Sequence, residues 1–580
     1  MSTLLSVQSL SYDLPSCSLL DRVSFTINKG ERIGLIGHNG CGKSTLIRLM
    51  FGEISPKSGT ISRSNQCLIA RIEQYLPTHL LQQTLLASVL DVLPREMHLS
   101  ESWRAEALLS EIGFSETDWG LLAGSLSGGQ HTRLLMARAL ITEPDLLLLD
   151  EPSNHLDLPT LLWLENFLSQ WRGTFVLVSH DKRLLDSVTN STIILRDRSL
   201  SFFSLPCSEA REALSQQDEA DFHRNQHQQK EIDRIAHSAK RLSIWGHVYN
   251  NASFSRKAQS MEKRVTKLKD SQTELTDGSP WTLQLHGLAM RANRLLELSD
   301  VIVKASESSP SLFQVMNKQL KSGDRIALIG RNGCGKSSLM RYLWQAWLAG
   351  TQAGSFAIHP QCRIGYYDQN QDQLDANKSL IDALQDFSLL PEEQKKMALI
   401  SAGFAYHRHS QLVSSLSGGE KARLLFIALS LADFHLLFLD EPTNHLDLEG
   451  KEELIDSLTQ FVGAFILVTH DRELMEKSCN RFWLIKNGEL KEYYDSEQLY
   501  SVFDTEMPVK KNPAPPTAIQ RLDNSNTLEL SDEEKLLEQL LELEAKLEAD
   551  LKRKKKYQKP KLQQAWKQEI DVLNQQLKIN

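Results

Sequence analysis

Two nearly identical ten-residue strings constrain the fold of this chain more than any other feature. LDEPSNHLDL begins at residue 149, and LDEPTNHLDL begins 290 positions later, at residue 439. Three further motif pairs keep the same order and nearly the same spacing: GHNGCGKST with GRNGCGKSS, LSGGQ with LSGGE, and VSHD with VTHD. Solenoid repeats are roughly 20 to 50 residues long, so a period of this length indicates a duplicated domain. We predict one copy at residues 1–205 and the other at 291–506.

Composition excludes several classes of protein. With 580 residues, 41% hydrophobic and 24% charged, the chain is expected to be globular and to contain several domains. No apolar run approaches the roughly 18 residues that a membrane helix needs, and the start lacks a secretory signal pattern. The seven cysteines form no CxxC pair, which argues against a zinc site, an iron–sulfur cluster or a disulfide framework. We therefore expect a cytoplasmic protein without a membrane partner.

Residues 206–290, between the two copies, differ in charge from the rest of the chain. Residues 222–270 contain eleven Lys or Arg and four acidic residues, a net charge of +7, whereas the whole chain carries -8. Helix-forming residues flank the turn-forming string SIWGHVYNN at 243–251, so the segment is predicted to be a basic helical hairpin linker. Its tip carries Trp245, His247 and Tyr249, which could stack on bases. A solvated hairpin whose charges only maintain solubility is the alternative.

The C-terminal region has a different pattern again. Residues 507–530 include the Pro-rich string VKKNPAPPT and are predicted to be a flexible tether. In residues 531–580, Leu536, Leu540, Leu543 and Leu547 follow 4,3,4 spacing, and a second apolar series follows Pro560. This spacing predicts a C-terminal α-helical coiled-coil hairpin. A charged, partly helical tail is the alternative.

The pattern GxxxxGKS occurs twice, each time between a strand-like and a helix-like run. This context is typical of a phosphate-binding loop, where backbone N–H groups and a helix N-terminus converge on anionic oxygens. Lys43 and Lys336 are expected to reach the outer phosphates, and Ser44 and Ser337 to hold Mg²⁺. The two loops comprise Gly37, His38, Asn39, Gly40, Cys41, Gly42, Lys43, Ser44 and Thr45, and Gly330, Arg331, Asn332, Gly333, Cys334, Gly335, Lys336, Ser337 and Ser338.

Acidic residues end two apolar runs, LLLLDE and LLFLDE, that read as buried parallel strands. Open α/β sheets bind ligands at the carboxyl ends of such strands. Asp150 and Asp440 are therefore predicted to bind Mg²⁺, and Glu151 and Glu441 to act as general bases toward water. Taken alone, an acidic strand end would more often be a solvated loop or a helix cap.

Histidines and glutamines supply further candidates. His180 and His470 follow the apolar runs FVLVS and FILVT and could contact a γ-phosphate; a cap on a local turn is the alternative. Gln74 in RIEQY and Gln369 in YYDQN fit a sensor of metal and water, and their support is mainly positional.

The strings LSGGQ and LSGGE complete the set of motifs. Adjacent glycines let backbone amides approach a phosphate, and each string precedes a helix-like run. The candidate residues are Ser127, Gly128, Gly129 and Gln130, and Ser417, Gly418, Gly419 and Glu420.

In this order, the motifs resemble the nucleotide-binding domains of the ATP-binding cassette superfamily. The resemblance implies two tandem α/β cassettes that pack head to tail. Each ATP would lie between the phosphate loop of one cassette and the signature loop, LSGGQ or LSGGE, of the other. ATP and Mg²⁺ would be the cofactors, ATP hydrolysis the reaction, and a monomer with intramolecular cassette pairing the functional state.

The NHLD strings, the charged linker and the absence of a membrane segment resemble the F subfamily, whose members are soluble tandem-cassette ATPases. That resemblance implies a translation factor that binds the ribosome, with its rRNA and tRNA, near the tRNA exit site. Closure of the cassettes would couple the linker to peptidyl tRNA. The C-terminal hairpin resembles extensions of some members, which implies contact with DNA or RNA.

Four alternatives to this function stay open. They are a DNA-acting cassette ATPase that uses the C-terminal coiled coil, an antibiotic-resistance factor that protects the ribosome, the energy subunit of a transporter, and a nucleotide-gated scaffold without enzyme activity. The short tip at 243–254 disfavours the long-tipped resistance type, and fusion of both cassettes through a basic segment disfavours the transporter.

Three features depart from the family pattern. Tyr12 is placed to stack on adenine in the first copy, but the equivalent register in the second copy holds Val303. Gln130 and Glu420 differ between the two signature loops, which hints at unequal sites. The spacing from Gln74 to Ser127 leaves little room for the arm insertion of some relatives.

Overall fold

The computed structural model describes residues 2–14, 18–64, 67–73, 76–154, 156–248, 252–270, 281–291, 294–305, 309–350, 356–388, 390–444 and 446–504. The tether predicted at 507–530 and the coiled-coil hairpin predicted at 531–580 lie outside these residues. So do Gln74, Tyr249 and the side chains of Trp245 and His247.

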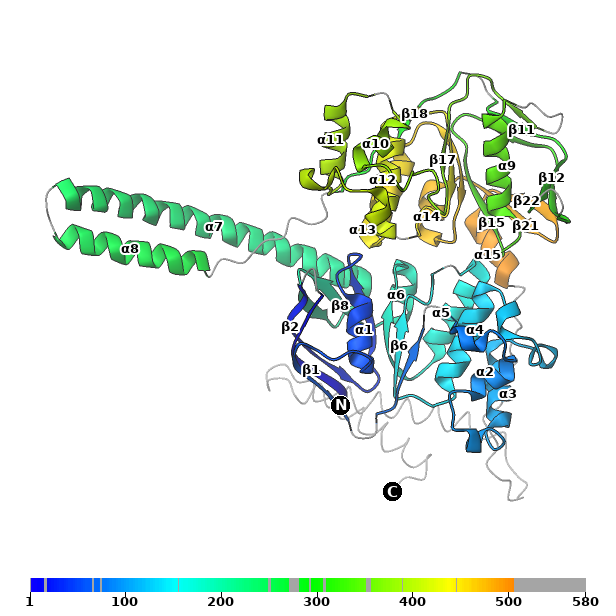
Figure 1. Ribbon diagram of the computed structural model, residues 1–580, viewed down its shortest axis with the longest axis horizontal. Helices are drawn as coiled ribbons and strands as arrows, with labels where there is room; N and C mark the ends of the chain where they lie inside the picture. Colours follow the sequence, from blue (N-terminus) through cyan, green and yellow to red (C-terminus); the bar gives the residue numbers. More distant parts are fainter. Residues whose placement is uncertain are drawn as a thin grey trace, which may run out of the picture. The chain divides into compact units, whose positions relative to one another are not determined.

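The first cassette contains a mainly parallel sheet and a smaller antiparallel one (Figure 1). The parallel sheet has the order β5-β6-β7-β3-β8-β9, in which only the edge strand β9 runs antiparallel to its neighbour. Its strands are β3 (Arg32–Gly37), β5 (Ile69–Ile72), β6 (Leu146–Asp150), β7 (Thr174–Val178), β8 (Ser191–Arg196) and β9 (Ser199–Phe203). The antiparallel sheet has the order β2-β1-β4, with β1 (Thr3–Asp13), β2 (Ser18–Asn28) and β4 (Ser58–Arg63).

Helices cover the parallel sheet of the first cassette. They are α1 (Lys43–Phe51), α2 (Leu85–Leu90), α3 (Ser102–Ile112), α4 (Gly128–Leu140), α5 (Leu158–Gln170) and α6 (Lys182–Val188). Single 3₁₀ turns lie at η1 (Thr78–Leu80), η2 (Arg95–Met97), η3 (Glu116–Asp118) and η4 (Ala123–Ser125). Since α1 directly follows β3, and β6 ends at Asp150, the phosphate loop and the acidic strand end lie at the same edge of the sheet.

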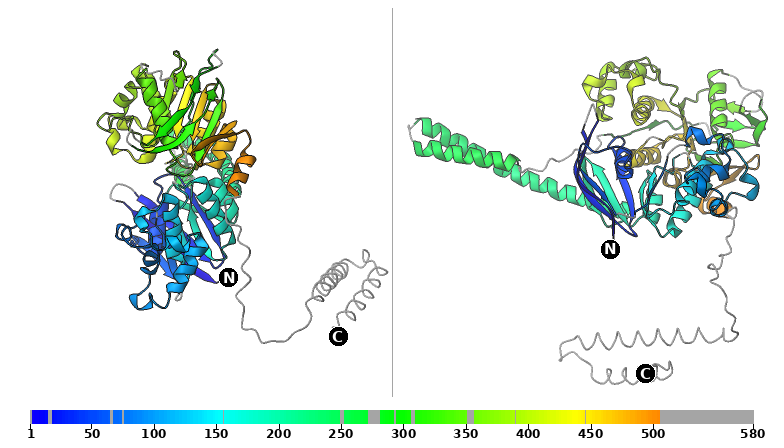
Figure 2. Two further views of the ribbon diagram at one scale, coloured as in Figure 1. Left: turned by 90° about the vertical axis from the view of Figure 1, so that its right-hand side faces the viewer. Right: turned by 60° about the horizontal axis from the view of Figure 1, so that its bottom comes forward.

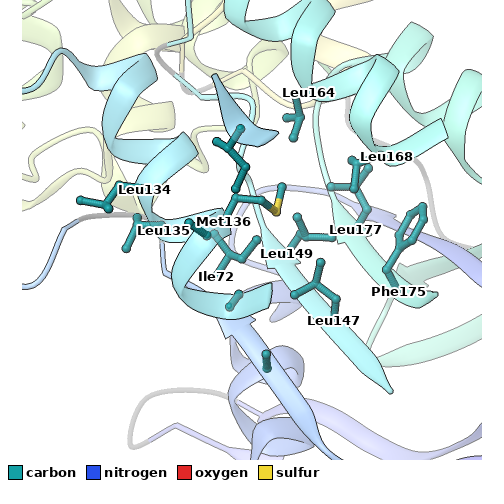
Figure 3. Packing of buried hydrophobic residues seen from close by; sticks show 14 of the residues in the cluster. Ile72, Leu134, Leu135, Met136, Leu147, Leu149, Leu164, Leu168, Phe175 and Leu177 are labelled. Carbon is teal, nitrogen blue, oxygen red and sulfur yellow. The ribbon is translucent and has the colours of Figure 1, made fainter. Parts of the chain in front are cut away.

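The core of this cassette explains why β6 is a continuous apolar run. Leu147 and Leu149 pack on one face of the sheet with Phe175, Leu177 and the helices α4 and α5 (Figure 3). Leu146 and Leu148 pack on the other face, against the antiparallel sheet and α1. A parallel strand buried on both faces needs apolar side chains at every position, which is what LLLL supplies.

The second cassette repeats this plan. Its main sheet has the order β12-β13-β22-β21-β15-β20-β19-β17, and two small sheets have the orders β14-β11-β16 and β10-β18. The strands are β10 (His286–Gly287), β11 (Leu296–Leu298), β12 (Val301–Lys304), β13 (Ser311–Val315), β14 (Lys318–Leu320), β15 (Arg325–Gly330), β16 (Phe356–Ile358), β17 (Ile364–Tyr367), β18 (Asp433–Phe434), β19 (Leu436–Asp440), β20 (Ala464–Val468), β21 (Arg481–Lys486) and β22 (Glu489–Tyr493).

The helices of the second cassette also follow the order of the first. They are α9 (Lys336–Leu348), α10 (Leu380–Gln385), α11 (Glu392–Ser401), α12 (Gly418–Ser430), α13 (Leu448–Gln460), α14 (Arg472–Ser478) and α15 (Ser496–Asp504), with 3₁₀ turns η5 (Tyr406–Arg408) and η6 (Val413–Ser415). The duplicated motifs therefore occupy matching places: a loop before α1 or α9, a strand end before α5 or α13, and a cap before α4 or α12.

The interdomain segment, residues 206–290, contains α7 (Cys207–Val248) and α8 (Ala252–Asp270), which lie side by side in Figures 1 and 2. The helix α7 continues through Gly246, where the sequence favours a turn. Glycine costs about 1 kcal/mol inside a helix, which a long flanking helix can absorb. At its other end the segment already packs on the second cassette, because β10 pairs in parallel with β18.

Within the part of the chain that the structure describes, we find no helix with the length and apolar content needed to cross a membrane.

Candidate functional site

Each GxxxxGKS loop lies between a parallel strand and a helix. Gly42 and Gly335 cap α1 and α9 with φ of 105° and 103°, in the left-handed region, and no side chain bonds to the first turn of either helix. The first N–H groups of each helix therefore point into the loop, as anion binding requires. Lys43 Nζ donates to the carbonyl oxygens of Gly37 at 2.8 Å and His38 at 3.0 Å. Lys336 Nζ makes the matching bonds within the second loop.

The serine after each lysine bonds to the aspartate at the end of the neighbouring strand. Ser44 Oγ donates to Asp150 Oδ1 at 3.1 Å, and Ser337 Oγ donates to Asp440 Oδ1 at 3.0 Å. Burial raises the pKa of Asp150, and it raises the pKa of Asp440 to about 6. The second oxygen of Asp440, Oδ2, is buried and has no hydrogen-bond partner among the described residues. A hydroxyl beside such a carboxylate oxygen is a donor set that fits Mg²⁺.

The following glutamates adopt a strained backbone. Glu151 and Glu441 have φ of 50° and 48°, a region that non-glycine residues rarely occupy and that is concentrated at functional sites. Their N–H groups donate to the carbonyls of Val178 at 3.0 Å and Val468 at 2.8 Å, which holds this conformation.

The two glutamate side chains have partly different neighbours. Both accept a hydrogen bond from the asparagine of NHLD: Asn154 Nδ2 donates to Glu151 Oε2 at 2.5 Å and Asn444 Nδ2 to Glu441 Oε2 at 2.7 Å. They differ in the second neighbour, because Glu151 Oε1 lies 3.2 Å from His180 Nε2, whereas Glu441 Oε2 accepts from Gln369 Nε2 at 2.9 Å. Burial acts to raise the pKa of Glu151, but the hydrogen bond and charge of His180, the charge of Lys43 and the hydrogen bond from Asn154 together lower it, so the net pKa shift is downward. Glu151 is therefore ionised at neutral pH.

Both histidines lie behind the glutamates and are neutral. Burial lowers the pKa of His180, and lowers the pKa of His470 to about 3. Both ring nitrogens of His470 are buried without a hydrogen-bond partner among the described residues. The local turns are capped by the next residues instead, since Asp181 accepts from Leu184 N–H and Asp471 from Leu474 N–H. The imidazole of His470 is thus left for another ligand, whereas Nε2 of His180 already contacts Glu151.

The signature loops begin two helices with the same capping arrangement. Ser127 accepts from Gln130 N–H and Ser417 from Glu420 N–H, and each partner side chain accepts the serine N–H in return. The glutamine and the glutamate therefore serve the same cap, so the difference noted in the sequence leaves this geometry unchanged. Glu420 also pairs with Arg408 at 2.7 Å.

One cavity of about 580 Å³ brings residues of both cassettes together. From the first cassette its wall includes Asn39, Gly40, Glu151, Asn154 and His180. From the second it includes Ser417, Gly418, Gly419, Glu420, Arg423, Glu441 and His470. The phosphate loop of the first copy and the signature loop of the second thus share one cavity. The other pair of loops does not line it.

Two aspartates that the sequence pointed to only as part of NHLD connect the cassettes directly. Asp447 Oδ2 accepts the backbone N–H of Asn39 at 3.4 Å, while its Oδ1 accepts from Gly450 N–H and caps α13. Asp157 Oδ2 accepts the N–H of Asn332 at 3.3 Å and caps α5 in the same way. Each phosphate loop is therefore bound by the other cassette. The sequence did indicate an aspartate at a helix N-cap position after the apolar strand in each copy, but it did not indicate the contact with the other cassette.

Two further residues compared in the sequence, Tyr12 and Val303, do not line the cavity. Tyr12 is a half-buried residue of β1 that packs against the apolar cluster of its own cassette. Val303 in β12 is 2% exposed and belongs to the core of the second cassette. Adenine stacking on Tyr12 stays a prediction, as does the role of Gln74.

Comparison with known proteins identifies the two halves. The family described as ABC transporter matches residues 20–154 and 313–444. Probable ATP-binding protein YheS of Escherichia coli is 32% identical over 82% of this chain and 78% of its own length. ABC transporter F family member 2 of Arabidopsis thaliana is 30% identical over 84% of this chain and 77% of its own length. Ribosome protection protein VmlR of Bacillus subtilis is 28% identical over 84% of this chain and 88% of its own length.

A solved structure supports the same architecture. The archaeal ribosome recycling factor aABCE1, crystallised with the ribosomal stalk protein aP1, aligns with a TM-score of 0.57 over 86% of this chain and 92% of its own. At 17% identity this likeness concerns the fold, and it shows two tandem cassettes. Together with the motifs in both halves, the relatives settle the family. The chain belongs to the F subfamily of the ATP-binding cassette superfamily, and it is an ATPase.

Proposed function

We propose that this ATPase holds two ATP molecules between its cassettes and works as a clamp. Site A consists of the phosphate loop of the first cassette and the signature loop of the second, Ser417–Glu420. Site B consists of the phosphate loop of the second cassette and the signature loop of the first, Ser127–Gln130. The cavity that joins Gly40 and Glu151 to Ser417 is the observation that carries this proposal. ATP binding closes the cassettes and hydrolysis lets them part.

Within each site the residues have separate tasks. Lys43 and Lys336 release their loop carbonyls to bind the outer phosphate oxygens, as phosphate-loop lysines do. Ser44 with Asp150, and Ser337 with Asp440, would hold Mg²⁺ together with Gln74 and Gln369. Bound there, Mg²⁺ supplies positive charge that offsets the charge of the phosphates.

The water that attacks the γ-phosphate needs a base and an orienting group. Glu151 and Glu441 accept its proton, and the neutral imidazoles of His180 and His470 donate to the γ-phosphate. Since His180 and Glu151 lie 3.2 Å apart, base and donor already contact one another in site A.

We further propose that the ribosome is the partner and that the clamp acts near the tRNA exit site. Two observations support this. The relative VmlR is named a ribosome protection protein. The interdomain segment carries +7 over residues 222–270, a charge that suits phosphate neutralisation and counterion release. Closure would move α7 and α8 against peptidyl tRNA.

The experiment uses the variant in which Glu151 and Glu441 are both changed to Gln. With ATP it should pellet with ribosomes, because it binds nucleotide and stays closed, and with ADP it should stay in the supernatant. A variant that also carries Lys43→Ala and Lys336→Ala is the control and should not pellet with either nucleotide. ATP-dependent retention on duplex DNA, without pelleting on ribosomes, would instead favour a DNA-acting ATPase.

A further inference from the structure

We propose that the interdomain segment is coupled to site A more strongly than to site B. This inference rests on the proposed function and assigns the regulation of one of its two sites. Both ends of the segment are bound to helix α13, and that helix begins at the aspartate that contacts the phosphate loop of site A.

The N-terminal end of the segment is attached by an ion pair. Arg211, near the start of α7, donates through Nη1 and Nη2 to the two carboxylate oxygens of Glu452 on α13, at 2.6 and 2.7 Å. A bidentate pair fixes the mutual orientation of its two groups as well as their distance. The Nζ of Lys182 lies 3.6 Å from the same carboxylate. A displacement of α7 therefore acts directly on α13.

The C-terminal end of the segment is attached to the same helix by its backbone. The N–H of Leu283 donates to Glu453 at 3.3 Å, and the N–H of Leu285 donates to Ser457 at 2.9 Å. Trp281, only 4% exposed, packs against Gly450 so closely that a Cβ on that glycine would lie 2.9 Å from the indole. Both ends of the segment thus contact α13, while the start of α7 also packs into the core of the first cassette through Cys207 and Ala210.

Helix α13 reaches site A through two charged residues. Asp447, its N-cap, accepts the N–H of Asn39 in the phosphate loop. Arg423 lies 3.6 Å from Asp447 and lines the cavity beside the signature loop. The guanidinium of Arg423 lies over the indole of Trp281, with 5.6 Å between the guanidinium carbon and the centroid of the ring. Trp281 of the interdomain segment therefore contacts Arg423, a residue that lines the cavity.

The equivalent positions at site B make different contacts. The positions 290 residues earlier than Glu452, Glu453 and Arg423 hold Leu162, Trp163 and Arg133. Leu162 packs against an apolar cluster of the second cassette, and Trp163 lies 4.9 Å from Arg133 within the first cassette. The aromatic partner of the signature arginine thus comes from α5 in the first cassette and from the interdomain segment in the second.

This difference has a direct physical consequence. Anything that displaces α7 and α8, such as a bound nucleic acid, changes the position of α13 and with it Asp447 and Arg423. ATP turnover at site A then responds to the segment. We expect a smaller response at site B, because its Asp157 contact runs through α5, which the start of α7 meets, among the described residues, only by apolar packing in the core of the first cassette.

The test measures the two sites separately. Glu441→Gln leaves the base of site A in place, and Glu151→Gln leaves the base of site B. Adding Arg211→Gln should change ATP turnover about threefold or more in the first background and less than about 1.5-fold in the second. The exchange of Arg211→Glu combined with Glu452→Arg should restore the rate of ATP turnover at site A. A general loss of structure would not allow this recovery.

A matched control removes a similar ion pair elsewhere. Arg183 on α6 pairs with Glu476 on α14, again between the cassettes and through both guanidinium nitrogens, but outside the interdomain segment. Arg183→Gln should change ATP turnover equally in both backgrounds.

A second pair of variants tests the contact between Trp281 and Arg423. Trp281→Phe retains a ring under Arg423 and should keep the rate of ATP turnover at site A, whereas Trp281→Leu lacks the ring and should lose it.

Two results would overturn the coupling: an equal effect of Arg211→Gln in both backgrounds, including no effect in either, or the same one-sided pattern from Arg183→Gln. Failure of the proposed function looks different. In that case the variant with both Glu151→Gln and Glu441→Gln would still hydrolyse ATP at the original rate.

Discussion

Asp447 in the second cassette accepts a hydrogen bond from the backbone N–H of Asn39 in the first, with 3.4 Å between the two atoms. The duplicate of this contact, Asp157 with Asn332 at 3.3 Å, joins the cassettes a second time. The loop residue before each asparagine differs, however: it is His38 in one copy and Arg331 in the other. We therefore expect the two sites to respond differently to pH.

The first prediction concerns His38. Its ring lies 3.5 Å from Asp447 and 3.6 Å from Glu449, and the hydrogen bond with Asp447 raises its pKa against the opposing effects of burial and of Arg423. Because the pKa is raised, the contact is complete below the ordinary histidine value of about 6.5 and is lost as pH rises through the raised value. Replacement by arginine keeps the charge at every pH.

The measurement compares Glu441→Gln with and without His38→Arg between about pH 6 and pH 8.5, a range around the histidine value. The ATPase rate with His38→Arg, divided by the rate without it, should rise with pH. For a partly exposed ion pair the rise should be about fivefold at most. The same ratio measured in the Glu151→Gln background should stay constant. A ratio that is flat in both backgrounds would show that the His38 contact does not support site A.

The second prediction concerns Mg²⁺. Ser337 donates to Asp440, whose other oxygen has no hydrogen-bond partner among the described residues. Ser337→Ala removes a ligand and the group that orients the carboxylate, so the Mg²⁺ concentration for half-maximal ATPase should rise about tenfold or more. Ser337→Thr retains the hydroxyl and should stay near the original requirement. Equal Mg²⁺ requirements for the two variants would contradict a metal role for this hydroxyl.

The third prediction concerns the core. Leu147 of β6 is fully buried in the core of the first cassette (Figure 3). Leu99 is 95% exposed. Leu147→Ala leaves a cavity and should lower the free energy of unfolding by about 2–5 kcal/mol. Leu99→Ala makes the same chemical change on the surface and should change the free energy of unfolding by about 0.5 kcal/mol or less. Chemical denaturation checks both, and similar losses would mean that the core is misassigned.

Features that depend on neighbouring residues could be predicted from the sequence. The GxxxxGKS pattern fixes a loop before a helix, because glycine is needed at Gly42 and Gly335 for a positive φ. The run LLLL predicts a buried parallel strand, because each leucine meets one face of the sheet. The duplicated order of motifs then predicts two cassettes of the same fold.

The family resemblance predicted that each phosphate loop faces the signature loop of the other copy, but the individual residue contacts between the copies could not be predicted. Nothing near Asp447 in the sequence indicates Asn39 as its partner, because the two residues lie 408 positions apart. Trp281 reads as an isolated apolar residue, and only the packing shows that it takes the place of Trp163 beside a signature arginine. The exchange of Gln130 for Glu420 suggested unequal sites, yet both side chains make the same cap.

The central claim is that each ATP is shared between the cassettes, and one comparison tests it most directly. In the Glu441→Gln background only site A hydrolyses ATP, so Ser417→Arg should lower the remaining rate at least about tenfold, the size expected when a bound phosphate loses its partners. Ser127→Arg, which removes the same cap from α4, should lower it far less. If Ser127→Arg abolishes the remaining turnover and Ser417→Arg spares it, each cassette completes its own site and the shared arrangement is wrong.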